Sequence, residues 1–219
     1  MIITYYGHSC FKLRGGEGTV ITDPFSEYVG FEFPNLSADV VTVSNDSPAH
    51  NNAQAVSETA RRDKPFIIDH PGEYEIEGIS VFGVKAFHDD QQGSELGSNI
   101  IYTFLLDNLR VCHLGALGHE LSEEHVTEIG LVDVLFVPVG GLRTLDPKTA
   151  IKVTRSLEPN VVIPMLYQTP LHNDKVFADL QPLEDFLKEY EAEPETVDKL
   201  NIDRGSLPEE MELVVMERI

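Results

Sequence analysis

Two histidines stand at the ends of β-rich runs, where a fold of strands and helices usually presents its functional groups. His50 lies in the polar loop 44–52 that follows the run 39–43, and His88 directly follows the run 79–87. Imidazole side chains bind transition metals and exchange protons near neutral pH. Two other runs lead into the histidine-bearing segment 112–119 and into the segment 161–167. The four strand ends are therefore expected to converge on one pocket.

The runs that must position these residues alternate with turn signals. Runs rich in β-branched and aromatic residues predict strands over 2–6, 10–13, 19–22, 39–43, 67–68, 79–87, 100–106 and 110–114. The dipeptide Asp107-Asn108 predicts a tight hairpin between the last two of these strands. Helical patterns predict helices over 53–62, 122–129, 146–157 and 183–190, with strands over 133–137, 160–164 and 211–216. This order predicts an α/β (α+β) fold of mixed sheets with helices outside.

Composition limits the classes of partner. The chain has 219 residues, 42% of them apolar, which suits one domain over residues 1–219. Sixteen Lys and Arg against 37 Asp and Glu give a net charge of −21, which opposes binding to nucleic acid or to an anionic membrane. No basic leader or membrane-length apolar run is visible, and Cys10 and Cys112 lie in apolar runs as reduced core thiols do. A cytoplasmic location is therefore expected.

Six short motifs occur in an order that is specific to one family. They are Tyr6-Gly7-His8-Ser9-Cys10-Phe11, Asp23-Pro24-Phe25, His70-Pro71-Gly72-Glu73-Tyr74-Glu75, Cys112-His113-Leu114-Gly115, Pro138-Val139-Gly140-Gly141 and Thr144-Leu145-Asp146. With them, essentially the whole chain resembles the UlaG-like branch of the metallo-β-lactamase superfamily. The resemblance implies a four-layer αββα sandwich of two mixed sheets flanked by helices, with a metal pocket at one edge of the sheets.

The resemblance also implies a set of seven metal-ligand positions, most of which hold other residue types in this chain. The family binds two divalent metals through an HxHxDH loop, a later His, a bridging Asp and a last His. Laid onto this sequence, these positions fall, in order, on Asn45, Ser47, Ala49, His50, His88, Ala116 and Leu166. Only two of the seven positions, His50 and His88, still hold a side chain that binds metals strongly.

The replacements do not exchange one good ligand for another. Ala and Leu offer no lone pair, a protonated Ser is weak, and Asn offers at best an amide oxygen. A catalytic zinc usually has three protein ligands, so His50 and His88 alone fall short. We therefore expect no tightly bound cofactor, and at most one weakly held divalent metal, Zn or Mn, at these two histidines.

Other polar groups near the strand ends are candidates for lining the pocket. The candidate set is His8, Asn45, Asp46, Ser47, Ala49, Asp89, His113, Ala116, His119, Leu166 and Tyr167. Histidines near strand ends are more often hydrogen-bonded packing residues, and acidic loop residues in so acidic a chain are usually solvated. A serine or cysteine nucleophile at Ser9 or Cys10 is not favoured, because the local sequence lacks the G-x-S-x-G elbow.

These observations leave three hypotheses. The first is a pseudoenzyme that keeps the hydrolase fold to bind a small molecule or to assemble, a homo-oligomer being the default assembly. The alternative is a metal-dependent hydrolase of a phosphodiester, lactone or other ester, with a single-metal site rebuilt from His50, His88 and a group such as Asp46, His113 or His119. The third is a structural subunit whose pocket is filled by apolar residues.

Overall fold

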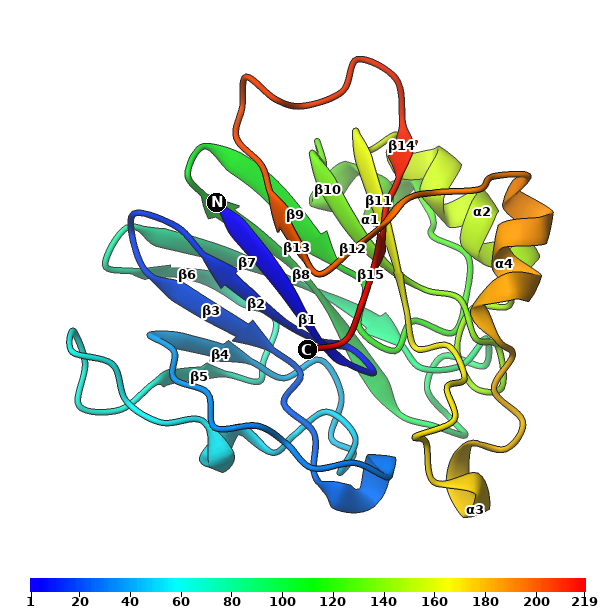
Figure 1. Ribbon diagram of the computed structural model, residues 1–219, viewed down its shortest axis with the longest axis horizontal. Coiled ribbons are helices and arrows are strands. Elements are labelled where there is room, and N and C mark those ends of the chain that lie inside the picture. Colours follow the sequence, from blue (N-terminus) through cyan, green and yellow to red (C-terminus); the bar gives the residue numbers. More distant parts are fainter.

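Two mixed β-sheets pack against each other in the computed structural model, which describes residues 1–219 (Figure 1). The first sheet contains, in spatial order, β13 (Lys199–Asn201), β1 (Ile2–Gly7), β2 (Cys10–Arg14), β3 (Thr19–Thr22), β4 (Val40–Thr42) and β5 (Phe66–Ile68). The second contains β14 (Glu212–Leu213), β11 (Val161–Met165), β10 (Val134–Pro138), β9 (Leu109–His113), β8 (Ser98–Leu106), β7 (Ile79–Phe87) and β6 (Gly72–Ile76). A small third sheet pairs β12 (Thr196–Val197) with β15 (Val215–Met216).

Helices flank this sandwich, as the resemblance implies. They are α1 (Glu123–Ile129), α2 (Pro147–Leu157), α3 (Asp174–Phe177) and α4 (Leu183–Tyr190), with the 3-10 turns η1 (Glu27–Val29) and η2 (Ala53–Ala55). Helices α2 and α4 lie beside each other along the second sheet (Figure 1). The predicted αββα fold of two mixed sheets is confirmed. No helix is long and apolar enough to cross a bilayer.

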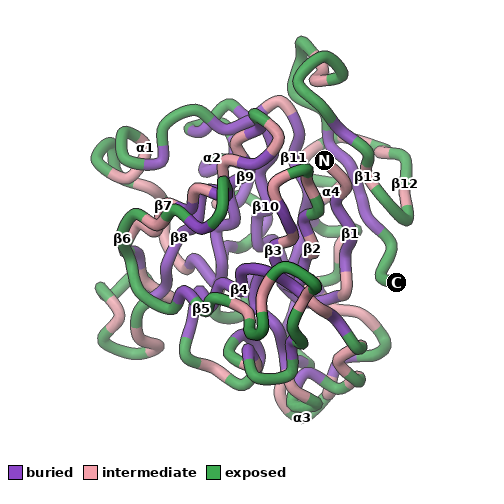
Figure 2. The backbone as a smooth tube through the Cα atoms, turned by 90° about the vertical axis from the view of Figure 1, so that its left-hand side faces the viewer, coloured by how far each residue is buried: buried purple, intermediate pink, exposed green.

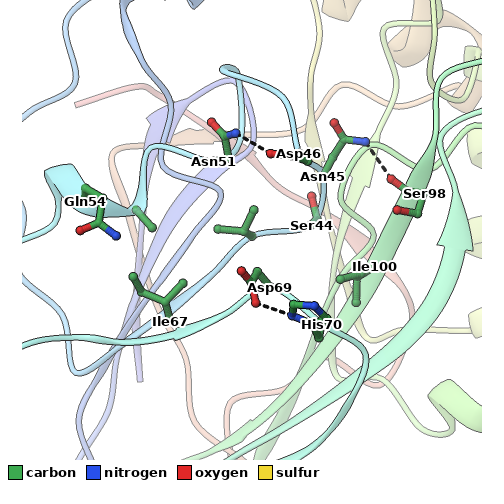
Figure 3. Close-up of a pocket in the computed structure, with 12 residues that line it drawn as sticks. Ser44, Asn45, Asp46, Asn51, Gln54, Ile67, Asp69, His70, Ser98 and Ile100 are labelled. Carbon is green, nitrogen blue, oxygen red and sulfur yellow. Dashed lines mark hydrogen bonds and ion pairs between the residues drawn. The ribbon is translucent and has the colours of Figure 1, made fainter.

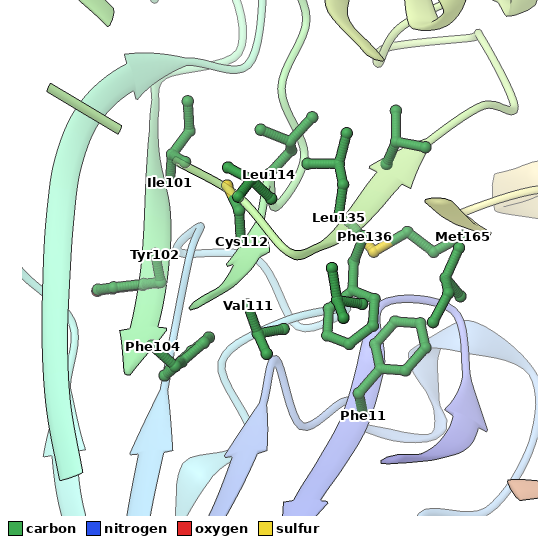
Figure 4. Packing of buried hydrophobic residues seen from close by; sticks show 14 of the residues in the cluster. Phe11, Ile101, Tyr102, Phe104, Val111, Cys112, Leu114, Leu135, Phe136 and Met165 are labelled. Atoms are coloured by element: carbon green, nitrogen blue, oxygen red, sulfur yellow. The ribbon is translucent and has the colours of Figure 1, made fainter. Parts of the chain in front are cut away.

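Alternating side chains along the strands of the first sheet build two apolar layers. Val20 and Val40 belong to the main cluster between the sheets, whereas the next residues, Ile21 and Val41, belong to a second cluster on the outer side. Between the sheets, the rings of Phe11 and Phe136 stack with centroids 4.0 Å apart (Figure 4). Buried segments gather along the strands, and exposed segments lie mainly in the connecting loops (Figure 2).

Most predicted elements occur close to their expected positions. Helix α1 begins after Ser122, the first residue of the helix predicted over 122–129, and the Ser122 hydroxyl caps it by accepting the backbone N–H of His125. Helix α2 begins after Asp146, whose carboxylate accepts two backbone N–H groups. Asp107 and Asn108 both have a positive φ, +51° and +60°, which is the conformation that a two-residue hairpin requires. Both cysteines are buried and free, as expected.

The helix predicted over 53–62 is wrong, because only the single turn η2 forms there. The backbone leaves the helical path at Val56, and Ser57 then pairs with the segment before β4, donating its N–H to the carbonyl of Leu36 at 2.8 Å. The hydroxyl of Thr59 donates to the buried carboxylate of Asp39 at 2.5 Å. The first contact takes up a backbone N–H that a helix would use, and the second ties the segment to Asp39 through a side chain.

Candidate functional site

The loop 44–52 after β4 separates two cavities. The smaller cavity has a volume of about 70 Å³ and is lined by His8, Tyr28, Ser47, Ala49, His50, His88, Gly141, Leu142, Arg143, Thr144, Leu166, Val176, Phe177 and Leu180. The larger cavity, of about 550 Å³, lies against the other side of the loop and takes in Asn45, Asp46, Asp69 and His70 (Figure 3). We call the first the histidine pocket, because three imidazoles reach it from three different segments.

His50 is held in the histidine pocket by a buried carboxylate. Its Nδ1 lies 2.8 Å from Oδ2 of Asp23 and 3.0 Å from Oγ of Ser9. In the neutral tautomer that fits these contacts, Nδ1–H donates to Asp23 and Nε2 keeps its lone pair. No protein group bonds Nε2, so His50 presents an acceptor to the pocket.

Asp23 is fully buried yet remains a carboxylate. Burial by itself raises the pKa of Asp23, but His50, His113 and hydrogen bonds outweigh burial and bring this pKa below its ordinary value. Ser44 supplies two of those bonds, from its backbone N–H at 2.8 Å and from its hydroxyl at 2.5 Å. Asp23 therefore anchors both His50 and the start of the loop 44–52.

Ser9, His50 and Asp23 do not form a catalytic triad. In a triad the serine faces the imidazole nitrogen opposite the one that the carboxylate holds. Here Ser9 and Asp23 approach the same nitrogen of His50, and Ser9 has no solvent-exposed surface. The arrangement instead orients the His50 ring, as carboxylate partners orient metal-binding histidines.

Asn45 fixes the tautomer of His88. The Nδ2 amide of Asn45 donates to the carbonyl of Ser98 at 2.8 Å and lies 3.3 Å from Nδ1 of His88. Because an NH₂ group only donates, Nδ1 of His88 accepts and the neutral ring carries its proton on Nε2. Burial, followed by the neighbouring His50 and Arg143, lowers the pKa of His88 to about 4, so the ring is neutral at pH 7. His88 therefore presents an N–H donor to the pocket.

His8 receives its orientation from His172. The backbone N–H of Thr169 donates to Nδ1 of His172 at 3.1 Å, which places the proton of the neutral His172 ring on Nε2. That Nε2 lies 3.3 Å from Nδ1 of His8, so it donates to His8, and the His8 proton lies on Nε2. Burial, followed by the neighbouring histidines, lowers the pKa of His8 well below its ordinary value. His8 is thus a second neutral donor.

Close backbone approaches hold the walls of the histidine pocket. A Cβ at Gly118 would collide with the backbone of His88, and a Cβ at Gly140 would collide with the carbonyl of Leu166. The turn after Gly140 is closed by the backbone N–H of Thr144, which donates to the carbonyl of Gly141 at 2.9 Å. This turn carries Arg143 to the pocket.

Several candidates from the sequence lie elsewhere or are occupied by structural contacts. Both ring nitrogens of His113 are used, one by the carbonyl of Ser9 and one by the backbone N–H of Gly115. His119 likewise bonds the backbone of Phe87 and Glu120. Asp89 accepts the backbone N–H groups of Gln91, Gly93, Glu95 and Leu96.

The remaining candidates divide between the cavities. Asn45 and Asp46 line the larger cavity, where Asp46 accepts a hydrogen bond from Asn51 at 2.8 Å (Figure 3). Tyr167 lines a third cavity of about 360 Å³. Ser47, Ala49 and Leu166 line the histidine pocket, and Ala116 is fully buried behind it, its N–H donating to Asn99 at 2.8 Å.

Sequence reasoning assigned no role to three residues of the site. Asp23 belongs to the motif Asp23-Pro24-Phe25, and only its position in space reveals that it holds His50. His172 had no visible partner in the sequence, yet it orients His8. Arg143 lies in the sequence between the motifs 138–141 and 144–146, with no pattern that predicts a role for it. The turn brings it to the pocket.

Comparison with known proteins places the chain in a family. Residues 2–166, about three quarters of the chain, match the β-lactamase superfamily domain. The chain belongs to this superfamily. Curated relatives named UPF0173 metal-dependent hydrolases include one from Archaeoglobus fulgidus, 28% identical over 196 residues (77% of this chain and 84% of the relative). One from Thermoplasma volcanium is 24% identical over 188 residues (76% and 83%).

Solved structures share the fold. A Thermotoga maritima protein, whose name proposes a Zn-dependent hydrolase of the metallo-β-lactamase superfamily, is 39% identical with a TM-score of 0.80, and the match covers 99% of this chain and 98% of that one. Igni18, a metallo hydrolase from Ignicoccus hospitalis, is 18% identical with a TM-score of 0.67, covering 99% and 95%. The second likeness is one of fold alone.

Proposed function

We propose that this chain is a member of the UlaG-like branch that binds a small molecule in the histidine pocket without dinuclear metal catalysis. The observation that carries this proposal is the donor chemistry of the family's ligand positions. Ala49, Ala116 and Leu166 offer only hydrocarbon, so the residues present do not fit a dinuclear centre.

The polar replacements support the same conclusion. Asn45 turns its amide N–H groups, not its oxygen, toward His88 and Ser98. His88 accepts at Nδ1 and keeps its proton on Nε2, so this Nε2 has no lone pair for a metal. Of the family positions, only His50 presents a free imidazole lone pair to the pocket.

A second candidate function is a single-metal hydrolase of a phosphodiester, lactone or other ester. It is favoured by the Asp23–His50 pair, because a carboxylate behind an imidazole raises its basicity and orients it as a ligand. It is also consistent with the relatives, which are named metal-dependent hydrolases. This function requires His8 and His88 to exchange their tautomers, since both now present N–H groups.

Hydrolysis assays separate the two functions. Chain purified without a metal-binding tag is incubated with excess Zn²⁺ or Mn²⁺ and assayed on a 4-nitrophenyl phosphodiester and on a simple lactone, with and without chelator. The matched variants are His50→Ala and, as a control at an exposed histidine, His70→Ala. We expect background rates throughout. Turnover that both the chelator and His50→Ala abolish, while His70→Ala does not, would establish the single-metal hydrolase instead.

A further inference from the structure

The lining of the histidine pocket lacks the acidic side chains that predominate in the chain as a whole. The chain carries 37 acidic residues against 16 basic ones, yet none of the side chains that line this pocket is a carboxylate. Arg143 is its one guanidinium, and no lysine is present. The larger cavity across the loop takes in Asp46 and Asp69 instead. An anion in the histidine pocket would therefore meet a guanidinium and no lining carboxylate, with the buried carboxylate of Asp23 lying behind the His50 ring.

The donors and acceptors that line the pocket limit which anions it can bind. The Nε2–H groups of His8 and His88 and the guanidinium of Arg143 are donors that suit anionic oxygens. In the neutral His50 ring, Nε2 is an acceptor, because Asp23 holds the proton on the opposite nitrogen. A ligand that satisfies all four groups has several acceptor oxygens and one O–H. A carboxylate or a sulfate lacks that O–H at neutral pH.

We propose that the histidine pocket binds the monoanionic phosphoryl group of inorganic phosphate or of a phosphate monoester. In this arrangement, His8, His88 and Arg143 donate to phosphoryl oxygens, and the P–OH donates to Nε2 of His50. No bond is made or broken. This inference rests on the proposed function, since it requires the pocket to be free of metal.

The size and rim of the pocket agree with such a ligand. Its volume of about 70 Å³ exceeds the roughly 10–15 Å³ that one water needs on the same measure, so one small tetrahedral ion has room. Tyr28 and Leu142 line the same pocket and remain 40% and 44% exposed. They give an apolar rim for the organic part of a monoester.

Calorimetric titration tests the phosphoryl assignment. Chelator-treated protein is titrated near pH 6.5 with inorganic phosphate, sulfate and phenyl phosphate. We expect phosphate to bind at least about tenfold more tightly than sulfate, because sulfate has no O–H for His50. Tighter binding of phenyl phosphate than of phosphate would identify a monoester as the source, and the reverse order would identify free phosphate.

Substitutions of two exposed arginines test the assignment without disturbing the fold. Arg143→Gln changes an exposed side chain that has no hydrogen bond to the rest of the protein, and it should weaken phosphate binding about tenfold. Arg155→Gln, an exposed change on α2 outside the pocket, should leave binding unchanged. Absence of phosphate binding, equal binding of sulfate, or unchanged binding by Arg143→Gln would each overturn the inference.

Metal content, measured on the same sample before chelation, distinguishes this failure from failure of the proposed function. If the protein is free of metal and does not bind phosphate, only the phosphoryl assignment is contradicted. Stoichiometric metal together with chelator-sensitive hydrolysis contradicts the proposed function. The phosphoryl inference then fails as well, because it requires a metal-free pocket.

Discussion

The side-chain amide of Asn45 bridges the carbonyl of Ser98 and Nδ1 of His88, at 2.8 and 3.3 Å. Because both contacts need an N–H from Asn45, the amide orientation and the His88 tautomer determine each other. The pocket therefore holds one imidazole that accepts, His50, facing one that donates, His88.

This tautomer assignment can be observed directly. Long-range ¹⁵N–¹H NMR spectra at pH 7 should show His88 protonated at Nε2 and His50 protonated at Nδ1, so that each ring serves as the control for the other. Asn45→Asp replaces the donor with an acceptor and should move the His88 proton to Nδ1. A wild-type His88 that already carries its proton on Nδ1 would contradict the assignment.

The buried Asp23 carboxylate should contribute strongly to stability. Asp23→Asn removes the charge that pairs with His50 and alters the acceptor used by Ser44. We expect the free energy of unfolding in urea to fall by about 3 kcal/mol, as for other buried pairs that lose one partner. Asp46→Asn, at an exposed carboxylate with one hydrogen bond to Asn51, should change it by less than about 0.5 kcal/mol. Equal losses of unfolding free energy in Asp23→Asn and Asp46→Asn would show that Asp23 does not anchor His50 and the loop 44–52.

Stability should decrease as the pH falls below the ordinary histidine range. Burial lowers the pKa of His172 to about 4, whereas an unfolded histidine titrates near about 6.5. The unfolded chain therefore takes up the proton first. The stability is complete above about pH 6.5 and is lost toward pH 4, by about 1.4 kcal/mol per pH unit for such a histidine.

The contribution of His172 can be isolated by substitution. His172→Gln should make the pH dependence of the urea midpoint shallower between pH 6.5 and pH 4, although His8 and His88 keep part of it. The exposed His70 serves as the control, and His70→Gln should leave the slope unchanged. A His172→Gln slope as steep as that of the wild type would contradict a neutral, buried His172.

The sequence predicted the scaffold because local patterns and packing agree there. Period-two alternation in β3 and β4 assigns Val20 and Val40 to one face and Ile21 and Val41 to the other. The predicted starts of the helices over 122–129 and 146–157 lie within a residue of the starts of α1 and α2. The helix expected over 53–62 failed because Ser57 bonds a segment about twenty residues away, a contact that no local pattern reveals.

The meeting of three of the four expected strand ends was predictable, whereas the segment 112–119 does not line the cavity and the hydrogen-bond polarity of the histidines could not be predicted. The strand ends at His50, His88 and Leu166 do meet at one cavity. Whether each imidazole donates or accepts depends on partners distant in sequence, such as Asp23 for His50 and His172 for His8. Only the folded arrangement brings those partners together.

Restoring the family's ligands should restore metal binding. The variant carries Asn45→His, Ser47→His, Ala49→Asp, Ala116→Asp and Leu166→His. Position 166 has a φ of +56°, a region that histidine enters more readily than leucine. We expect about two Zn²⁺ per chain and a rise in Tm on adding Zn²⁺, because metal bound only to the folded state stabilises it.

A matched control separates ligand chemistry from side-chain size. It carries Asn45→Gln, Ser47→Thr, Ala49→Asn, Ala116→Asn and Leu166→Met, and it should bind no more metal than the wild type. Failure of the restored variant to exceed this control, with both variants folded, would show that the five replacements are not what prevents dinuclear binding.

Metal content shows whether the folded protein holds a metal ion in the histidine pocket. Wild-type protein purified without a metal-binding tag is analysed for metals, then again after incubation with excess Zn²⁺ or Mn²⁺ and removal of the free ions. The donor set of the histidine pocket predicts less than about 0.2 metal per chain in both samples. About one tightly held metal per chain would contradict the account and would establish a metal site that includes His50.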